Sequence, residues 1–105
     1  MKPPFIVNEN ISVEPGALYV FRTVAALESY LEPWYVDEPH FIYDSDGMRL
    51  EITAHEHCVR LASKEPRELN PDLARTYFAA FLGLRDDTTT TLSELAAQSD
   101  SFADR

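Results

Sequence analysis

The sequence predicts an α+β fold, a small antiparallel sheet with two helices packed on one face. The first observation is the alternation of apolar and polar residues over 40–63, which is typical of a three-stranded meander. The second is the helical spacing of apolar residues in two segments, 23–31 and 71–83. The third is a run rich in strand-forming residues at 17–22, which predicts a further strand. Packing the helices on the sheet would bury the apolar sides of all these elements.

The first fifteen residues predict extended chain at the edge of the sheet. Short apolar runs at 5–7 and 11–13 alternate there with polar residues and proline. An exposed strand edge over 5–13 can pair with the same edge of a second copy. The sequence therefore leaves both a monomer and a homodimer open.

The first predicted helix has a defined start and end. The Thr23 hydroxyl is placed to accept a hydrogen bond from a free backbone N–H of the first turn. Leu27 and Leu31 lie four residues apart and belong to the apolar stripe. Pro33 ends the helix because it disfavours helical backbone at the residue before it. Residues 34–39 are then expected to form a linker.

The meander is predicted to consist of strands at 40–43, 48–54 and 58–63. The first turn is Asp44-Ser45-Asp46-Gly47, in which glycine suits a positive φ. In the middle strand Leu50, Ile52 and Ala54 share one side, and we expect that side to face the core.

Asn70 and Pro71 predict the start of the second helix, because Asn caps well and Pro suits the first helical position. The composition changes after this helix, so we expect a single domain over 1–85. Residues 86–105 are expected to form a Thr- and Asp-rich linker, a short and loosely docked helix capped by Thr91, and a frayed tail.

The chain is strongly acidic, with 18 Asp and Glu residues against 9 Lys and Arg residues and a net charge of -9. Six of the carboxylates lie between Thr23 and Met48, a stretch without any Lys or Arg. A field of one sign repels nucleic acid and anionic membranes and attracts basic molecules. We therefore expect a basic protein partner, and neither nucleic-acid nor membrane binding.

Cys58 is the only cysteine, so the chain forms no internal disulfide and suits a reducing compartment. No apolar stretch approaches the roughly 20 residues of a membrane span. The N-terminal residues also lack the apolar run of a secretory signal. A cytoplasmic location is the expectation.

The residues His55-Glu56-His57-Cys58 are the one group that suggests metal or thiol chemistry. A closed zinc site needs four ligands, and His40 is the only other His or Cys in the chain. The favoured interpretation is a polar turn with a half-buried Cys58, which leaves a metal-dependent or thiol enzyme as the weaker alternative. Asp44-x-Asp46-Gly47 does not fit an EF-hand, because the first ligand position would be Ile42.

The sequence thus predicts no catalytic residue, no metal ligand and no cofactor. Three glycines are too few for a phosphate-binding loop. Instead, aromatic residues within the acidic stretch are typical of a hot spot for a basic partner, with Trp34 or Tyr35 as the anchor. The predicted partner-binding residues are Glu28, Glu32, Trp34, Tyr35, Asp37, Glu38, Asp44 and Asp46.

Two segments, LESYLEPWYV at 27–36 and YDSDGMRL at 43–50, resemble small bacterial proteins regarded as immunity proteins of polymorphic toxin systems. The similarity extends over about 18–84, and its motifs are mostly structural. The resemblance implies stoichiometric inhibition of a cognate toxin, for example a nuclease, without catalytic residues. In such a complex carboxylates would occupy a basic cleft, and steering would accelerate association.

A different class of function also stays open, a small-molecule-binding or adaptor module whose surface acids serve only solubility. It predicts a concave apolar pocket and an association that is insensitive to salt.

Overall fold

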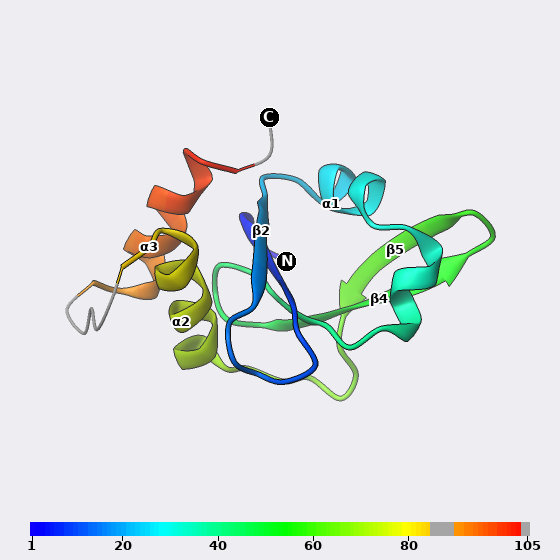
Figure 1. The fold of residues 1–105 in the computed structure, drawn as a ribbon, viewed down its shortest axis with the longest axis horizontal. Coiled ribbons are helices and arrows are strands. Elements are labelled where there is room, and N and C mark those ends of the chain that lie inside the picture. The colour runs from blue at the N-terminus through cyan, green and yellow to red at the C-terminus, as the bar shows by residue number, and fades with distance from the viewer. Residues whose placement is uncertain (85–89, 104–105) are drawn as a thin grey trace.

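A computed structural model describes residues 1–84 and 90–103 of the chain. In this part lies a five-stranded antiparallel sheet with the order β2-β1-β3-β4-β5 (Figure 1). The strands are β1 (Phe5–Glu9), β2 (Ala17–Phe21), β3 (Phe41–Tyr43), β4 (Arg49–His55) and β5 (Cys58–Ser63). The predicted α+β class is confirmed, and β3, β4 and β5 form the predicted meander.

The described residues also form three α-helices and one 3-10 helix. These are α1 (Val24–Tyr30), η1 (Pro33–Asp37), α2 (Pro71–Phe81) and α3 (Leu92–Asp100). In each α-helix the predicted N-cap side chain accepts a hydrogen bond from the backbone N–H three residues on; the caps are Thr23, Asn70 and Thr91. The segment expected to be a linker is mostly the helix η1. None of the helices in the described residues is long and apolar enough to cross a membrane.

β1 lies inside the sheet rather than at its edge. It pairs with β2, where Val7 lies opposite Tyr19, and with β3, where Val7 lies opposite Ile42. The two edge strands are β2 and β5. The expected edge over 5–13 is therefore wrong for 5–9, because both sides of that backbone are already paired. Two copies cannot associate by adding a strand to β1.

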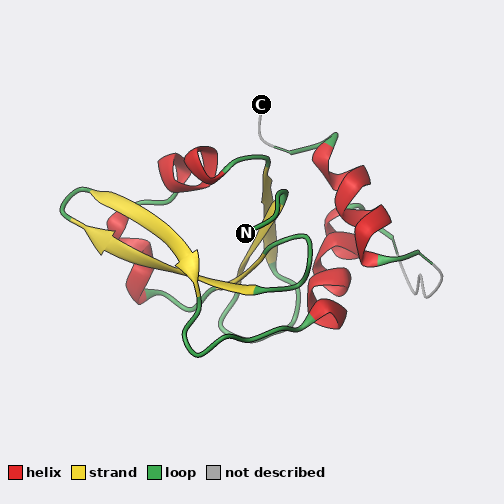
Figure 2. Cartoon of the chain, turned by 180° about the vertical axis from the view of Figure 1, so that it is seen from behind, coloured by secondary structure: helices red, strands yellow, loops and turns green. Residues whose placement is uncertain are grey.

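The helices lie on opposite faces of the sheet, whereas the sequence predicted two helices on one face. Phe5 and Val7 of β1 share a core cluster with Leu27 of α1. Ile6 lies between them and packs with Phe78 of α2 in a second cluster. Successive side chains of a strand point to opposite faces, so β1 contributes to both cores. Figure 2 shows α1 and the α2–α3 pair on opposite sides of the sheet.

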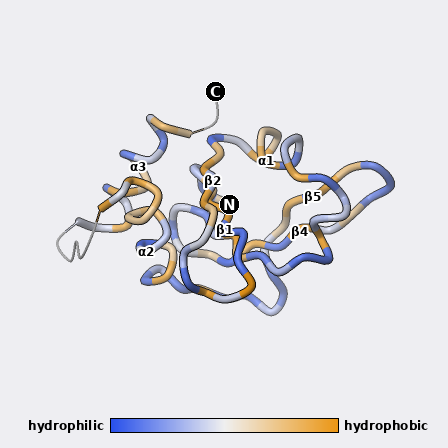
Figure 3. The backbone as a smooth tube through the Cα atoms, viewed as in Figure 1, coloured by the Kyte–Doolittle hydropathy of each residue, from blue (hydrophilic) through white to orange (hydrophobic). Residues whose placement is uncertain are grey.

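α3 is an integral part of the domain. Leu95, Ala96 and Ala103 are buried in the core cluster that contains the inner side of α2. Figure 3 shows hydrophobic and hydrophilic residues interleaved along both helices, as expected for elements that bury one side. The predicted boundary at residue 85 and the loosely docked helix are therefore wrong. Most of the predicted linker falls on 85–89, outside the described residues.

The turn between β3 and β4 forms as predicted and also positions α2. Gly47 has a φ of +86°, and a Cβ at this position would lie 2.5 Å from the Cα of Pro71. Glycine therefore permits both the turn and the close approach of α2. In β4 Leu50 and Ile52 are buried as predicted, whereas Ala54 is exposed, although its partner Val59 in β5 is buried.

Candidate partner-binding groove

A groove of mixed aromatic and acidic character lies where η1 meets β1 and β2. It consists of two hollows of about 410 and 260 Å³, which share Glu9, Trp34 and Tyr35 in their walls. We call the two together the aromatic groove. Its aromatic lining residues are Tyr19, Tyr30, Trp34 and Tyr35, and its acidic lining residues are Glu9, Glu32 and Glu38.

Trp34 and Tyr35, which follow one another in η1, point in different directions. The Trp34 side chain is 61% exposed, whereas Tyr35 is only 5% exposed and belongs to the core. The Trp34 indole N–H donates a 2.6 Å hydrogen bond to the Glu32 carboxylate, which orients the ring at the rim of the groove. Trp34 is therefore the available anchor. The alternative expectation, Tyr35 as an exposed anchor, is wrong because Tyr35 forms the inner wall.

The tyrosines of the groove are close to one another and to Glu9. The ring centroids of Tyr19 and Tyr30 lie 5.4 Å apart. The Glu9 charge, followed by a hydrogen bond with Tyr30, raises the pKa of the Tyr19 phenol. Burial, followed by the Glu9 charge, raises the pKa of Tyr35 far more strongly. At neutral pH these phenols are hydroxyl groups, so the charge of the groove comes from its carboxylates.

Among the described residues, no Lys or Arg lines either hollow of the groove. The carboxylates of Glu9, Glu32 and Glu38 therefore meet no basic side chain in its walls. An arrangement of this kind attracts a positively charged group and offers it aromatic faces.

The structure brings some of the predicted binding residues together. Glu32, Trp34 and Glu38 line the groove, and Asp37 is exposed on η1 beside it. The groove also contains residues outside the predicted binding set, among them Glu9, Tyr19 and Tyr30.

A signal for Glu9 was present in the sequence. Glu9 follows Phe5 and Val7 at two-residue spacing, so it shares their face of β1. Tyr19 is the cross-strand partner of Val7 and lies on the same face. An acidic residue in register with core positions is unusual and indicates a site at the margin of the core.

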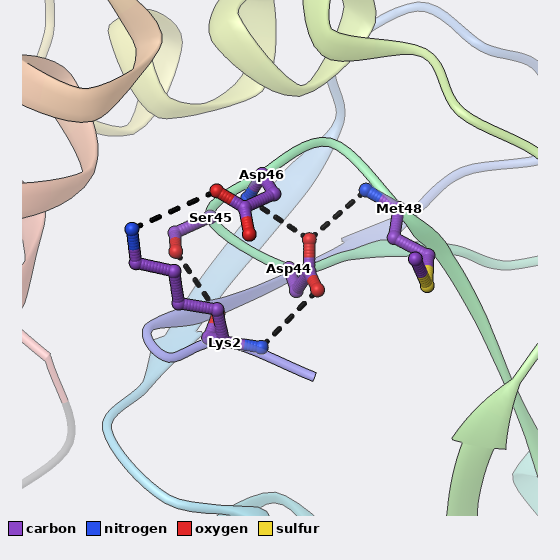
Figure 4. A network of polar contacts seen from close by, with 5 residues as sticks. All are labelled: Lys2, Asp44, Ser45, Asp46 and Met48. Atoms are coloured by element: carbon purple, nitrogen blue, oxygen red, sulfur yellow. Dashed lines mark hydrogen bonds and ion pairs between the residues drawn. The ribbon is translucent and has the colours of Figure 1, made fainter.

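Asp44 is not a surface residue, and its predicted role in partner binding is wrong. It is 2% exposed, and one carboxylate oxygen accepts hydrogen bonds from the backbone N–H groups of Asp46 and Met48 at 2.9 Å (Figure 4). The other oxygen accepts one from the Lys2 N–H at 3.2 Å. Asp44 thus holds the turn and the N-terminal segment together. Asp46 is exposed and forms a 3.7 Å ion pair with Lys2.

Glu28 is also used within the fold, although the sequence predicted it to be a partner-binding residue. Its carboxylate accepts a 2.8 Å hydrogen bond from the Leu61 N–H of the edge strand β5 and lies 3.8 Å from Arg60. The side chain is only 20% exposed. Glu28 therefore joins α1 to the sheet and contributes little free charge.

His55, His57 and Cys58 lie at the turn of the β4–β5 hairpin and are exposed. The expected half-burial of Cys58 is wrong. No group of three His, Cys, Asp or Glu side chains in the described residues is arranged to hold a metal ion.

A comparison with protein-family models finds no match, and comparisons with curated proteins and with solved structures find none either.

Proposed function

We propose that this protein is a binding protein that inhibits a basic partner protein by stoichiometric association through the aromatic groove. One observation carries the proposal: exposed aromatic surface and three carboxylates share a groove whose lining in the described residues contains no base. Following the resemblance to immunity proteins, the partner would be a cognate bacterial toxin, for example a nuclease.

Two parts of the groove would contribute differently to the affinity. The carboxylates of Glu9, Glu32 and Glu38 would accelerate the encounter with a basic surface. Trp34 would supply the buried contact, because a large, oriented indole is typical of interface hot spots. No enzymatic step is needed for such a function. The exposed thiol of Cys58, the only cysteine, favours action in a reducing compartment such as the cytoplasm.

The test begins with capture of the tagged protein's partner from native lysate at low and high salt. The captured protein is then purified, and its dissociation constant is measured by calorimetry. Charge reversal of the three groove carboxylates to Lys should weaken binding about a hundredfold, and W34A should weaken it about thirtyfold. Production of the partner alone should inhibit growth of a host cell, and co-production of this protein should restore growth.

The matched control is E56K, an equal change of charge per site at the exposed turn between β4 and β5. It should leave the dissociation constant within about twofold, because Glu56 does not line the groove and an exposed charge contributes little. If W34A and the groove reversals bind as the wild type does, the groove is not the interface. A partner whose binding ignores salt would favour the adaptor or small-molecule module.

A further inference from the structure

We propose that the aromatic groove is a receptor for a guanidinium group, supplied by an arginine side chain of the basic partner. This inference rests on the proposed function and specifies the chemistry that the site recognises. The geometry that points to it is an unpartnered tyrosine hydroxyl in a groove that combines aromatic faces with carboxylates.

The unpartnered group is the Tyr35 hydroxyl. Tyr35 is 5% exposed, and within the described residues its hydroxyl has no hydrogen-bond partner. Tyr35 lines both hollows of the groove, and the charges of Glu9 and Glu38 act on its phenol. A buried hydroxyl without a partner is costly for the fold. A ligand that reaches this wall would supply the missing hydrogen bond.

The exposed tyrosine beside this hydroxyl can move to give a ligand access to it. Tyr19 and Tyr30 line the same hollow as Tyr35, their phenols interact with the Tyr35 phenol, and Tyr30 is 52% exposed. Exposed side chains change rotamer on the nanosecond scale, so a shift of the Tyr30 ring can admit a planar group.

The groove offers what a guanidinium requires. Guanidinium is planar, stacks on aromatic rings and presents five N–H donors in a fixed fork. Trp34 and Tyr30 provide exposed ring faces, and the carboxylates of Glu9 and Glu32 are acceptors. The Tyr35 phenol oxygen is a third acceptor, set in a wall of low polarity. A Lys ammonium is more strongly hydrated and would lose more by entering such a site.

The probe is Nα-acetyl-L-arginine amide, and its neutral control is the citrulline analogue of the same shape. Trp34 is the only tryptophan of the chain, so its fluorescence reports on this groove alone. We expect saturable quenching by the arginine compound with a dissociation constant on the order of 1 to 10 mM, as one cation–π contact and a few charge-assisted hydrogen bonds imply. The citrulline compound should bind at least about tenfold more weakly.

Y35F separates recognition from folding. It should weaken binding of the arginine probe about tenfold, since it removes one hydrogen bond to a charged group. It should not lower the midpoint of urea unfolding, because it also removes a buried polar atom that lacks a partner. The matched control is Y43F, a change of the same kind in the second core, which should leave the dissociation constant unchanged.

The inference and the proposed function can fail separately. A second control is Nα-acetyl-L-lysine amide, which carries the same charge without the guanidinium. If the arginine probe does not quench Trp34, or if the citrulline or lysine compound binds as tightly as the arginine probe, the guanidinium assignment is overturned. The partner can still bind through the groove in that case. If the probe binds but does not compete with the purified partner, the groove serves a free guanidine compound, which overturns the assignment to a partner side chain.

Discussion

At the scale of single residues, the Asp44 carboxylate is the polar centre of the β3–β4 turn. It is buried and accepts three backbone hydrogen bonds, from Lys2, Asp46 and Met48. D44A would leave these N–H groups without their acceptor. We expect the free energy of unfolding, measured in urea, to fall by about 3 kcal/mol.

The control for this prediction is D46A, two residues away. The Asp46 side chain is 60% exposed, and its contact with Lys2 is a surface ion pair. Its removal should cost about 0.5 kcal/mol or less. Equal losses for the two variants would contradict the distinct role assigned to the Asp44 carboxylate.

The same neighbourhood shows how far residue roles follow from sequence. The turn and its Gly47 are predictable, because turn chemistry is local. The burial of Asp44 depends on Lys2, which lies far away in sequence, and no local pattern indicates that contact. Trp34 and Tyr35 pose the same problem: consecutive residues of a 3-10 helix point about 120° apart, and only the position of the sheet decides which one is buried.

At the scale of elements, α3 is expected to contribute to the stability of the whole domain. Leu95 is fully buried against the α2 side of the sheet. L95A should lower the free energy of unfolding by about 3 kcal/mol, through lost burial and the cavity that remains. A single transition in circular dichroism and in tyrosine fluorescence should accompany the loss, because α3 unfolds with the rest.

Q98A serves as the control on the exposed side of the same helix. It should change stability by less than about 0.5 kcal/mol. A loss for L95A that is as small as that of Q98A would mean that α3 does not contribute to the core.

The elements themselves were largely predictable, whereas their arrangement was not. The caps at Thr23, Asn70 and Thr91 and the alternation in β4 are local signals, and they identified the helices and the meander. The face that each helix covers depends on long-range packing. Phe5, Ile6 and Val7 are all apolar, so the strand shows no alternation, and this indicates a strand buried on both faces. That signal could have placed helices on both sides.

At the scale of the whole molecule, four bases form ion pairs away from the aromatic groove. These bases are Lys2, Arg22, Arg49 and Arg60, and their partners are Asp46, Asp100, Glu68 and Glu28. None of these four pairs involves the groove carboxylates of Glu9, Glu32 or Glu38. The carboxylates of the groove therefore keep their charge beside exposed aromatic surface, and this combination favours the groove as the site that attracts a basic partner.

Buried tyrosines in both cores make the folded protein less stable at alkaline pH. Burial raises the pKa of Tyr35 in the first core and of Tyr43 and Tyr77 in the second. The unfolded chain releases these phenol protons near pH 10, whereas the folded chain still holds them. By linkage, this contribution to stability is fully present below about pH 10 and is lost as the pH rises further.

We therefore expect the free energy of unfolding to fall above about pH 10, and to fall less steeply in Y35F than in the wild type. Urea unfolding at a series of pH values measures the slope, and tyrosinate absorbance follows the protons. Loss of charge on Lys residues contributes equally in both proteins, so the difference between the two slopes isolates the Tyr35 phenol. Identical slopes would show that the Tyr35 hydroxyl is open to solvent, and the wall of the aromatic groove would then lack the buried acceptor on which guanidinium recognition depends.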